Sequence, residues 1–122
     1  MVDQPLALII EDESGLAVMY ERVLQSMGYQ VMTASDGETG LACLQSYTPH
    51  FILSDMRLPI INGKDLIAYI ASEPRFDQTF VLVASSGQEY ETFITPLKRA
   101  RFIVKPLLPT QLIEVAQGLI ST

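Results

Sequence analysis

The chain is poor in cysteine and in basic residues, and it lacks a long apolar run. A single cysteine, Cys43, excludes an internal disulfide and a metal site built from several cysteines, so a reducing cytoplasm is the default location. Eight Lys and Arg residues against 14 Asp and Glu residues give a net charge of −6, which argues against a nucleic-acid-binding surface. No apolar run approaches the roughly 18 residues of a membrane span. We therefore expect residues 1–122 to form one soluble domain that contacts neither nucleic acid nor membrane.

Five short apolar runs predict five strands. They lie near residues 6–10, 30–34, 51–55, 80–84 and 101–104. The run at 30–34 is the least apolar, so we expect it near an edge of the sheet. Segments with apolar residues at helical spacing separate the runs. This alternation predicts an α/β fold with a parallel sheet and helices on both of its faces.

The helical segments differ in how clearly the sequence defines them. Ser14 is a plausible N-cap of the first helix, and Gly28 is its expected C-terminal stop. The fourth helix begins near Tyr90 and contains two threonines and Pro96, which disfavour a regular helix. We expect this helix to be short or distorted.

Polar side chains stand where the apolar runs end. They are Glu11, Asp12, Asp55, Ser85 and Lys105. Because the carboxyl ends of parallel strands lie along one edge of the sheet, we expect these side chains to meet there. This convergence is the strongest functional signal in the sequence.

Three carboxylates at one edge would repel one another. Glu11, Asp12 and Asp55 would then either share protons or hold a cation. Oxygen ligands and an open position suit Mg²⁺. The competing interpretation is structural: Glu11 and Asp12 would only favour the following helix N-terminus, and Asp55 would be a turn residue.

Lys105 and Ser85 add complementary groups to this edge. Lys105 offers a positive charge to Asp55 or to a phosphate oxygen, and Ser85 offers a hydroxyl donor. A carboxylate, a divalent metal, an ammonium and a hydroxyl are the groups needed for in-line phosphoryl transfer to an aspartate.

Taken together, these residues resemble the receiver domain of two-component response regulators. The matching positions are Glu11-Asp12, Asp55 with Pro59 and Gly63, Ser85, and Lys105-Pro106. The match extends over essentially the whole chain, with 30 residues from Asp55 to Ser85 and 20 from Ser85 to Lys105. The resemblance implies a flavodoxin-like, doubly wound (βα)5 sandwich with strand order 2-1-3-4-5.

The resemblance also implies a role for each site residue. Asp55 would be the phosphoacceptor, and Lys105 would bind the phosphoryl group. Mg²⁺ would be held by Asp12, Asp55 and the backbone carbonyl of Arg57, with Glu11 ligating through water. The Arg57 side chain would lie at the mouth of the site and influence phosphoryl uptake or hydrolysis.

A switch is implied at two further positions. Ser85 replaces the threonine usual in the family and keeps the hydroxyl that moves toward the phosphoryl group, although Ala84 and Ser86 leave the register open by one residue. Phe102 falls at the family's aromatic switch position. The Lys105-Pro106 peptide bond is usually cis in such domains.

The implied function is a phosphorylation-activated signalling receiver rather than a turnover enzyme. Its partners would be a sensor histidine kinase or a phosphotransfer protein, and a downstream protein or output domain. A homodimer formed on phosphorylation is a further partner that the family allows.

Three alternatives remain open from the residues. A phosphatase of the haloacid-dehalogenase type would need a second Asp where Arg57 stands. A flavodoxin would need a phosphate-cradling loop where Glu11-Asp12-Glu13 would repel phosphate. A degenerate receiver would keep the fold as a constitutive interaction module.

Three other residues invite a role and have a simpler explanation. His50 is the sole histidine, but it precedes the third predicted strand and so lies at the opposite edge from the site. Tyr90 and Phe93 would contribute to a partner surface or, more simply, to core packing of the fourth helix.

Overall fold

The computed structural model describes residues 4–58 and 61–120, and it contains a parallel five-stranded sheet. The strands are β1 (Leu6–Ile10), β2 (Gln30–Ala34), β3 (Phe51–Asp55), β4 (Phe80–Ser85) and β5 (Ala100–Val104). They pair in parallel in the order β2-β1-β3-β4-β5, so β2 is an edge strand. The predicted fold class, strand order and edge position are confirmed.

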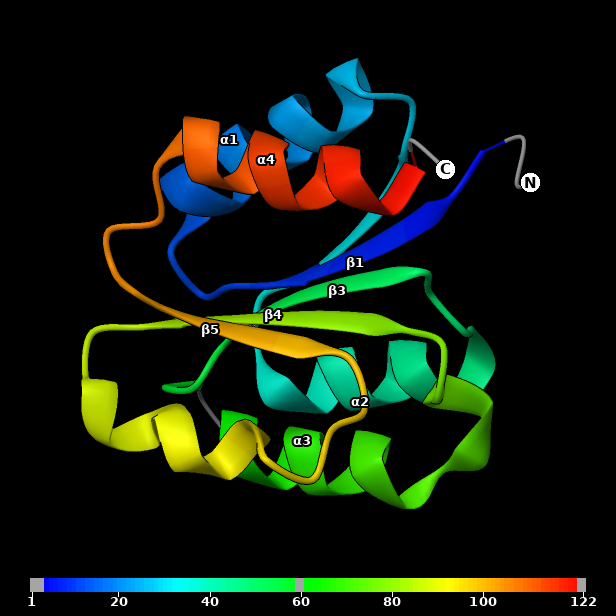
Figure 1. Cartoon of the computed structure of the whole chain (residues 1–122), viewed down its shortest axis with the longest axis vertical. Coiled ribbons are helices and arrows are strands. Elements are labelled where there is room, and N and C mark those ends of the chain that lie inside the picture. The colour runs from blue at the N-terminus through cyan, green and yellow to red at the C-terminus, as the bar shows by residue number, and fades with distance from the viewer. Residues whose placement is uncertain (1–3, 59–60, 121–122) are drawn as a thin grey trace.

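Helices cover both faces of the sheet. The α-helices are α1 (Ser14–Ser26), α2 (Gly37–Ser46), α3 (Gly63–Ser72) and α4 (Pro109–Ile120), and two 3₁₀ segments are η1 (Pro74–Phe76) and η2 (Gln88–Ile94). Helices α1 and α4 lie on one face, and α2 and α3 lie on the other together with η2 (Figure 1). This is the three-layer arrangement expected when parallel strands are joined by helical crossovers.

Alternation along each strand divides the core into two parts. In β1, Ala7 and Ile9 belong to the cluster beneath α1 and α4, whereas Leu8 and Ile10 belong to the cluster beneath α2 and α3. All four are at most 1% exposed. Strands buried on both faces read as continuous apolar runs, which is why the sequence located them so closely.

The N-cap of α1 differs from the prediction. Glu13, not Ser14, caps the helix: its carboxylate accepts hydrogen bonds from Gly15 N at 3.0 Å and from Leu16 N at 2.8 Å. Ser14 is instead the first helical residue. A glutamate can serve here because its negative charge is favourable beside the unpaired N–H groups of a helix start.

The weak fourth helix is confirmed as an irregular element. η2 is a 3₁₀ segment of seven residues with no buried residue, and no side chain caps its start at Gly87. Its C-terminal side is followed by Pro96, whose ring and missing N–H prevent the segment from continuing. The β4–β5 connection therefore lacks the regular helix found in the other crossovers.

Gly28 ends α1 as predicted. It has a φ of +96°, a conformation in which glycine carries no steric penalty. The turn brings Tyr29, which is 2% exposed, beneath α4, where its hydroxyl donates to the carbonyl oxygen of Ala116 at 3.0 Å. Burial raises the pKa of Tyr29 to about 12.

We expect Tyr29→Phe to lower the free energy of unfolding by about 1 kcal/mol at neutral pH, because one buried hydrogen bond is lost. The variant should also respond less to alkali. A phenol whose pKa is raised from 10.0 to about 12 on folding gives stability below pH 10 that is lost as the pH rises through 12. Urea unfolding at pH 7 and across pH 10–12 measures both effects, with the exposed Tyr47→Phe as the control; equal alkaline sensitivity of wild type and Tyr29→Phe would contradict the assignment.

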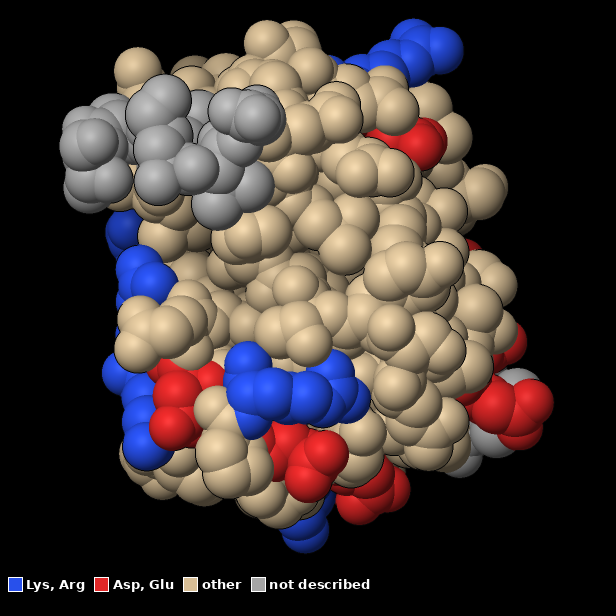
Figure 2. Space-filling view, turned by 90° about the vertical axis from the view of Figure 1, so that its right-hand side faces the viewer, with Lys and Arg blue, Asp and Glu red and all other residues tan. Residues whose placement is uncertain are grey.

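The face at the amino ends of the strands is dominated by uncharged residues (Figure 2). Basic and acidic side chains meet in a mixed group toward its lower edge, and further basic side chains follow its left edge. His50 belongs to this end, where its Nδ1 accepts a hydrogen bond from Leu6 N at 3.0 Å. In the described part of the chain, no helix combines the length and apolarity that crossing a bilayer requires.

Candidate functional site

The carboxyl edge of the sheet brings the predicted polar residues together. Glu11 and Asp12 follow β1, Asp55 ends β3, Ser85 ends β4, and Lys105 follows β5. Strand pairing fixes their relative positions, because Asp55 lies opposite Ala84 and Ser85 lies opposite Val104.

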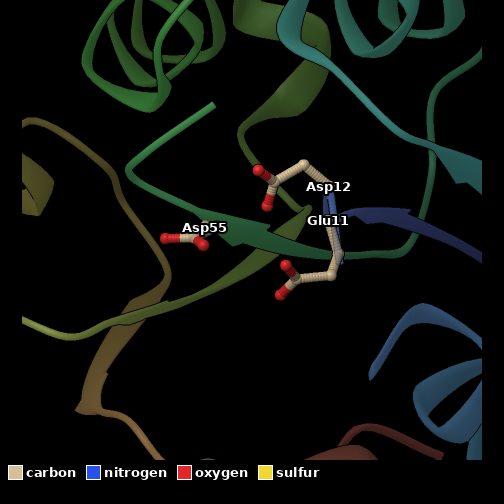
Figure 3. A group of neighbouring side chains, drawn as sticks. All are labelled: Glu11, Asp12 and Asp55. Atoms are coloured by element: carbon tan, nitrogen blue, oxygen red, sulfur yellow. The ribbon is translucent and has the colours of Figure 1, made fainter. Parts of the chain in front are cut away.

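Three carboxylates form the centre of the site. One oxygen each of Glu11, Asp12 and Asp55 lies within 4.8 Å of the others. Figure 3 shows Glu11 and Asp12 leaving the end of β1 in different directions, with Asp55 facing the same space from β3. Glu11 is 4% exposed and Asp55 is 9% exposed, whereas Asp12 is exposed. Oxygen ligands on an open, partly solvated edge match what a hard divalent cation requires.

Lys105 joins two of these carboxylates. Its Nζ lies 3.0 Å from Glu11 Oε1 and 3.0 Å from Asp55 Oδ2. Burial lowers the pKa of Lys105, but its hydrogen bonds to Glu11 and Asp55 outweigh burial and raise the pKa overall. The ammonium therefore stays charged and neutralises part of the acidic group.

The pKa of the Glu11 carboxyl is raised above its ordinary value. Burial raises the pKa of Glu11 more than the hydrogen bonds from Lys105 and Glu13 N lower it, and the charge of Asp55 raises it further. Three carboxylates face one ammonium, so the group carries more negative than positive charge. A second cation would offset this excess, which is the electrostatic condition for metal binding.

Backbone contacts hold the end of β3 in place. Asp55 Oδ1 accepts a hydrogen bond from Arg57 N at 3.1 Å, and Gly63 N donates to Met56 O at 3.0 Å. A Cβ on Gly63 would lie 2.5 Å from the carbonyl oxygen of Asp55 and 2.6 Å from the Cα of Met56. The start of α3 thus packs directly against the backbone of the strand that carries Asp55.

Ser85 and Phe102 lie on the neighbouring strands β4 and β5. Ser85 is fully buried, and its Oγ has no hydrogen-bond partner among the described residues. Its neighbour Ser86 is exposed and lies beyond the strand. Phe102 is half-buried, pairs with Val83, and packs against the core beneath α2 and α3. The Lys105–Pro106 peptide bond is cis.

The structure contains a cavity lined by aromatic side chains that the sequence did not predict. Tyr90 and Phe93 of η2 do pack against the core, as predicted, but they also line a cavity of about 440 Å³. The guanidinium of Arg57 lies 5.9 Å from the centre of the Tyr90 ring, and Lys64 Nζ lies 5.2 Å from that of Phe93. The signal in the sequence was weak, because contacts between residues about 30 apart depend on the tertiary fold.

Comparison with known proteins identifies the family. Residues 7–117 match the response regulator receiver domain. The chain belongs to this family. Receiver domains of this family are the signalling domains of two-component systems, so the predicted resemblance is confirmed.

Individual relatives are similar over most of the chain. The regulator of RpoS from Escherichia coli is 36% identical over 89 residues, covering 70% of this chain and 26% of that protein. The chemotaxis response regulator CheY4 of Vibrio cholerae has the same fold, with a TM-score of 0.85 at 24% identity over 96% of this chain and 99% of that one. The receiver domain of a sensor histidine kinase from Pseudomonas aeruginosa, with a magnesium ion coordinated in its active-site cleft, gives a TM-score of 0.83 at 21% identity over 98% of this chain and 99% of that one.

The curated relatives are longer proteins. The chain spans about half of their length or less. The similarity is to one segment of each of these relatives.

Proposed function

We propose that Asp55 accepts a phosphoryl group in a Mg²⁺-dependent reaction and that this phosphorylation switches a protein-binding surface. The observation that carries the proposal is the position of the Asp55 carboxylate, which faces two further carboxylates and accepts a hydrogen bond from the Lys105 ammonium. A nucleophilic oxygen, a site for a divalent cation and a fixed positive charge are what transfer to a carboxylate needs.

Mg²⁺ fits the donor set at this edge. Asp12, Asp55 and the backbone carbonyl of Arg57 would hold it, and Glu11 would contribute through water. The magnesium ion in the Pseudomonas aeruginosa receiver domain supports this choice of metal. When bound, the ion supplies positive charge that offsets the negative charge gathered during phosphoryl transfer.

The protein groups then divide the remaining tasks. Asp55 supplies the attacking oxygen, Arg57 N holds the other carboxylate oxygen, and Lys105 would turn from Asp55 toward an oxygen of the incoming phosphoryl group. Glu11 Oε1 accepts a second hydrogen bond from Lys105 and would keep the ammonium at the site.

Ser85 and Phe102 would change conformation when Asp55 is phosphorylated. The buried Ser85 hydroxyl lacks a partner among the described residues, so a phosphoryl oxygen within reach would satisfy a donor that now costs free energy. Ser85 lies two residues along β4 from Val83, which pairs with Phe102, so movement of Ser85 would change the space next to this half-buried ring. A phosphoryl group supplies enough new charge and hydrogen bonding to bias such a two-state element.

The partners follow from this chemistry. The donor would be the phosphohistidine of a sensor histidine kinase or phosphotransfer protein in the cytoplasm, and the surface that changes would bind a downstream protein, an output domain or a second copy of the chain. The domain would assist its own phosphorylation and dephosphorylation without acting as a turnover enzyme.

Mass spectrometry of the intact protein tests the proposal. Incubation with Mg²⁺ and acetyl phosphate should add one phosphoryl group, and chelating the metal should prevent the addition. Asp55→Asn should take up none, whereas Asp65→Asn, which changes an exposed acid of α3, should behave as wild type. Uptake by a folded Asp55→Asn would refute the phosphoacceptor assignment, and no uptake by the folded wild type would favour a constitutive interaction module.

A further inference from the structure

A second concave site opens beside the phosphoacceptor. The cavity of about 440 Å³ lies between η2 and the segment that follows β3. Its lining includes Asp12, Met56, Arg57, Leu58, Tyr90 and Phe93. This volume is in the range of about 300–1,000 Å³ that small-molecule sites occupy.

The cavity is continuous with the acidic group. Asp12 belongs to both, and Met56 and Arg57 directly follow Asp55 in the chain. A small phosphorylated molecule that presents its phosphoryl group to Asp55 therefore has the rest of its structure within reach of this cavity.

The lining selects for a particular kind of molecule. The ring centres of Tyr90 and Phe93 are 6.1 Å apart, the ring planes are inclined at 37°, and the half-buried Leu58 adds apolar surface. Aromatic and apolar surfaces of this kind favour a flat aromatic ligand over a methyl group, because more area leaves water and ring–ring contacts form.

The same cavity carries two positive charges. Arg57 and Lys64 both line it, and each lies over one of the aromatic rings. Both side chains are exposed, so their charged ends remain available to an anion. A leaving group that departs as a carboxylate would find two cations beside its aromatic body.

We propose that this cavity binds the acyl portion of small acyl phosphates and makes aromatic acyl phosphates better phosphodonors than acetyl phosphate. The proposal rests on the function assigned to Asp55 above. A carboxylate oxygen of Asp55 attacks phosphorus, the bond from phosphorus to the acyl oxygen breaks, and its electron pair stays on the departing carboxylate. One mixed anhydride replaces another, so the step needs neither a proton nor a further reactant.

Donor preference is measured as a ratio of rates. Rate constants for phosphorylation by benzoyl phosphate and by acetyl phosphate are compared at one Mg²⁺ concentration in wild type and in Phe93→Ala. For each protein, the rate constant with benzoyl phosphate is divided by the rate constant with acetyl phosphate. Dividing the wild-type ratio by the Phe93→Ala ratio cancels the difference in intrinsic reactivity between the two donors. We expect this quotient to be about 10, the effect of losing one aromatic contact in an apolar site.

Tyr47→Ala is the matched control. Tyr47 is 52% exposed and precedes β3, at the opposite end of the sheet from Asp55. Its ratio should equal that of wild type. A Phe93→Ala ratio equal to wild type overturns the inference and leaves the phosphoacceptor role intact, whereas absence of labelling by either donor overturns both.

A binding measurement on the wild type decides the question even if Phe93→Ala does not fold. Sodium benzoate, titrated into the unphosphorylated protein, should shift the NMR signals of Leu58, Tyr90 and Phe93 in a saturable way, and sodium acetate should not. Failure of benzoate to shift these signals, or identical shifts with acetate, overturns the proposal.

Discussion

Replacing Lys105 with methionine is expected to slow phosphorylation of Asp55 by about 100-fold or more, the usual effect of deleting one preorganised charge at a reacting centre. Lys105 Nζ lies 3.0 Å from Asp55 Oδ2, so the same ammonium is in place to neutralise the charge that the phosphoryl group brings. Methionine keeps most of the side-chain length and its apolar stem but supplies no charge. The rate is measured by intact mass against time with acetyl phosphate and saturating Mg²⁺.

The same variant is expected to be less stable without metal. Removing the cation leaves Glu11, which is 4% exposed, and Asp55, which is 9% exposed, without their shared partner. Breaking a buried ion pair from one side costs on the order of 3 kcal/mol. Mg²⁺ should restore much of this loss, because a divalent cation at the acidic group stabilises only the folded state. Urea unfolding with and without Mg²⁺ measures the loss and its recovery.

Lys98→Met is the matched control for stability. Lys98 Nζ lies 2.9 Å from Asp77 Oδ2, but both side chains are exposed, at 67% and 38%. Exposed pairs contribute roughly 0–1 kcal/mol, so this variant should remain close to wild type with or without Mg²⁺. If Lys105→Met were as stable as Lys98→Met and took up the phosphoryl group at the wild-type rate, both roles assigned to Lys105 would be wrong: stabilising the carboxylates and neutralising the phosphoryl charge.

The sheet and its polar edge were predictable because the relevant signals are local. A strand buried on both faces reads as a nearly continuous apolar run, and an ionisable residue that ends the run marks the carboxyl edge of the sheet. Asp55, the last residue of β3, and Lys105, which follows β5, mark such ends clearly. Ser85 shows where the pattern is less sharp: it belongs to β4 and is fully buried, yet its hydroxyl made the predicted strand end at residue 84.

Other features depended on contacts that composition does not encode. Ser14 is the better N-cap by propensity, but the longer Glu13 side chain reaches two backbone N–H groups of α1 from one residue earlier. The contact between Tyr90 and Arg57 depends on how η2 packs against the segment after β3, and local sequence does not determine that packing. The convergence of polar side chains at the carboxyl edge of the sheet was therefore predictable from the sequence, whereas the cavity beside it was not.

Gly63→Ala is expected to lower the free energy of unfolding by about 2–3 kcal/mol, because a side chain is forced into filled space. The added Cβ would meet the Asp55 carbonyl oxygen at 2.5 Å and the Met56 Cα at 2.6 Å, and neither backbone atom can move without shifting the end of β3. A displacement of about 1 Å at a reacting group can cost roughly 100-fold in rate, so phosphoryl uptake should fall as well. Thermal unfolding by circular dichroism and the mass-spectrometric rate measure the two effects.

Gly118→Ala separates this contact from the general effect of adding a methyl group to a helical glycine. A Cβ at Gly118 in α4 meets no heavy atom within 4 Å, so this variant should gain about 0.5–1 kcal/mol from the higher helix propensity of alanine. Opposite signs for the two substitutions would show that Gly63 is required by the backbone at the end of β3 rather than by the helix it begins. If both variants gained stability and took up the phosphoryl group at the wild-type rate, the backbone at the end of β3 could shift without cost. In that case α3 would not be the element that positions Asp55.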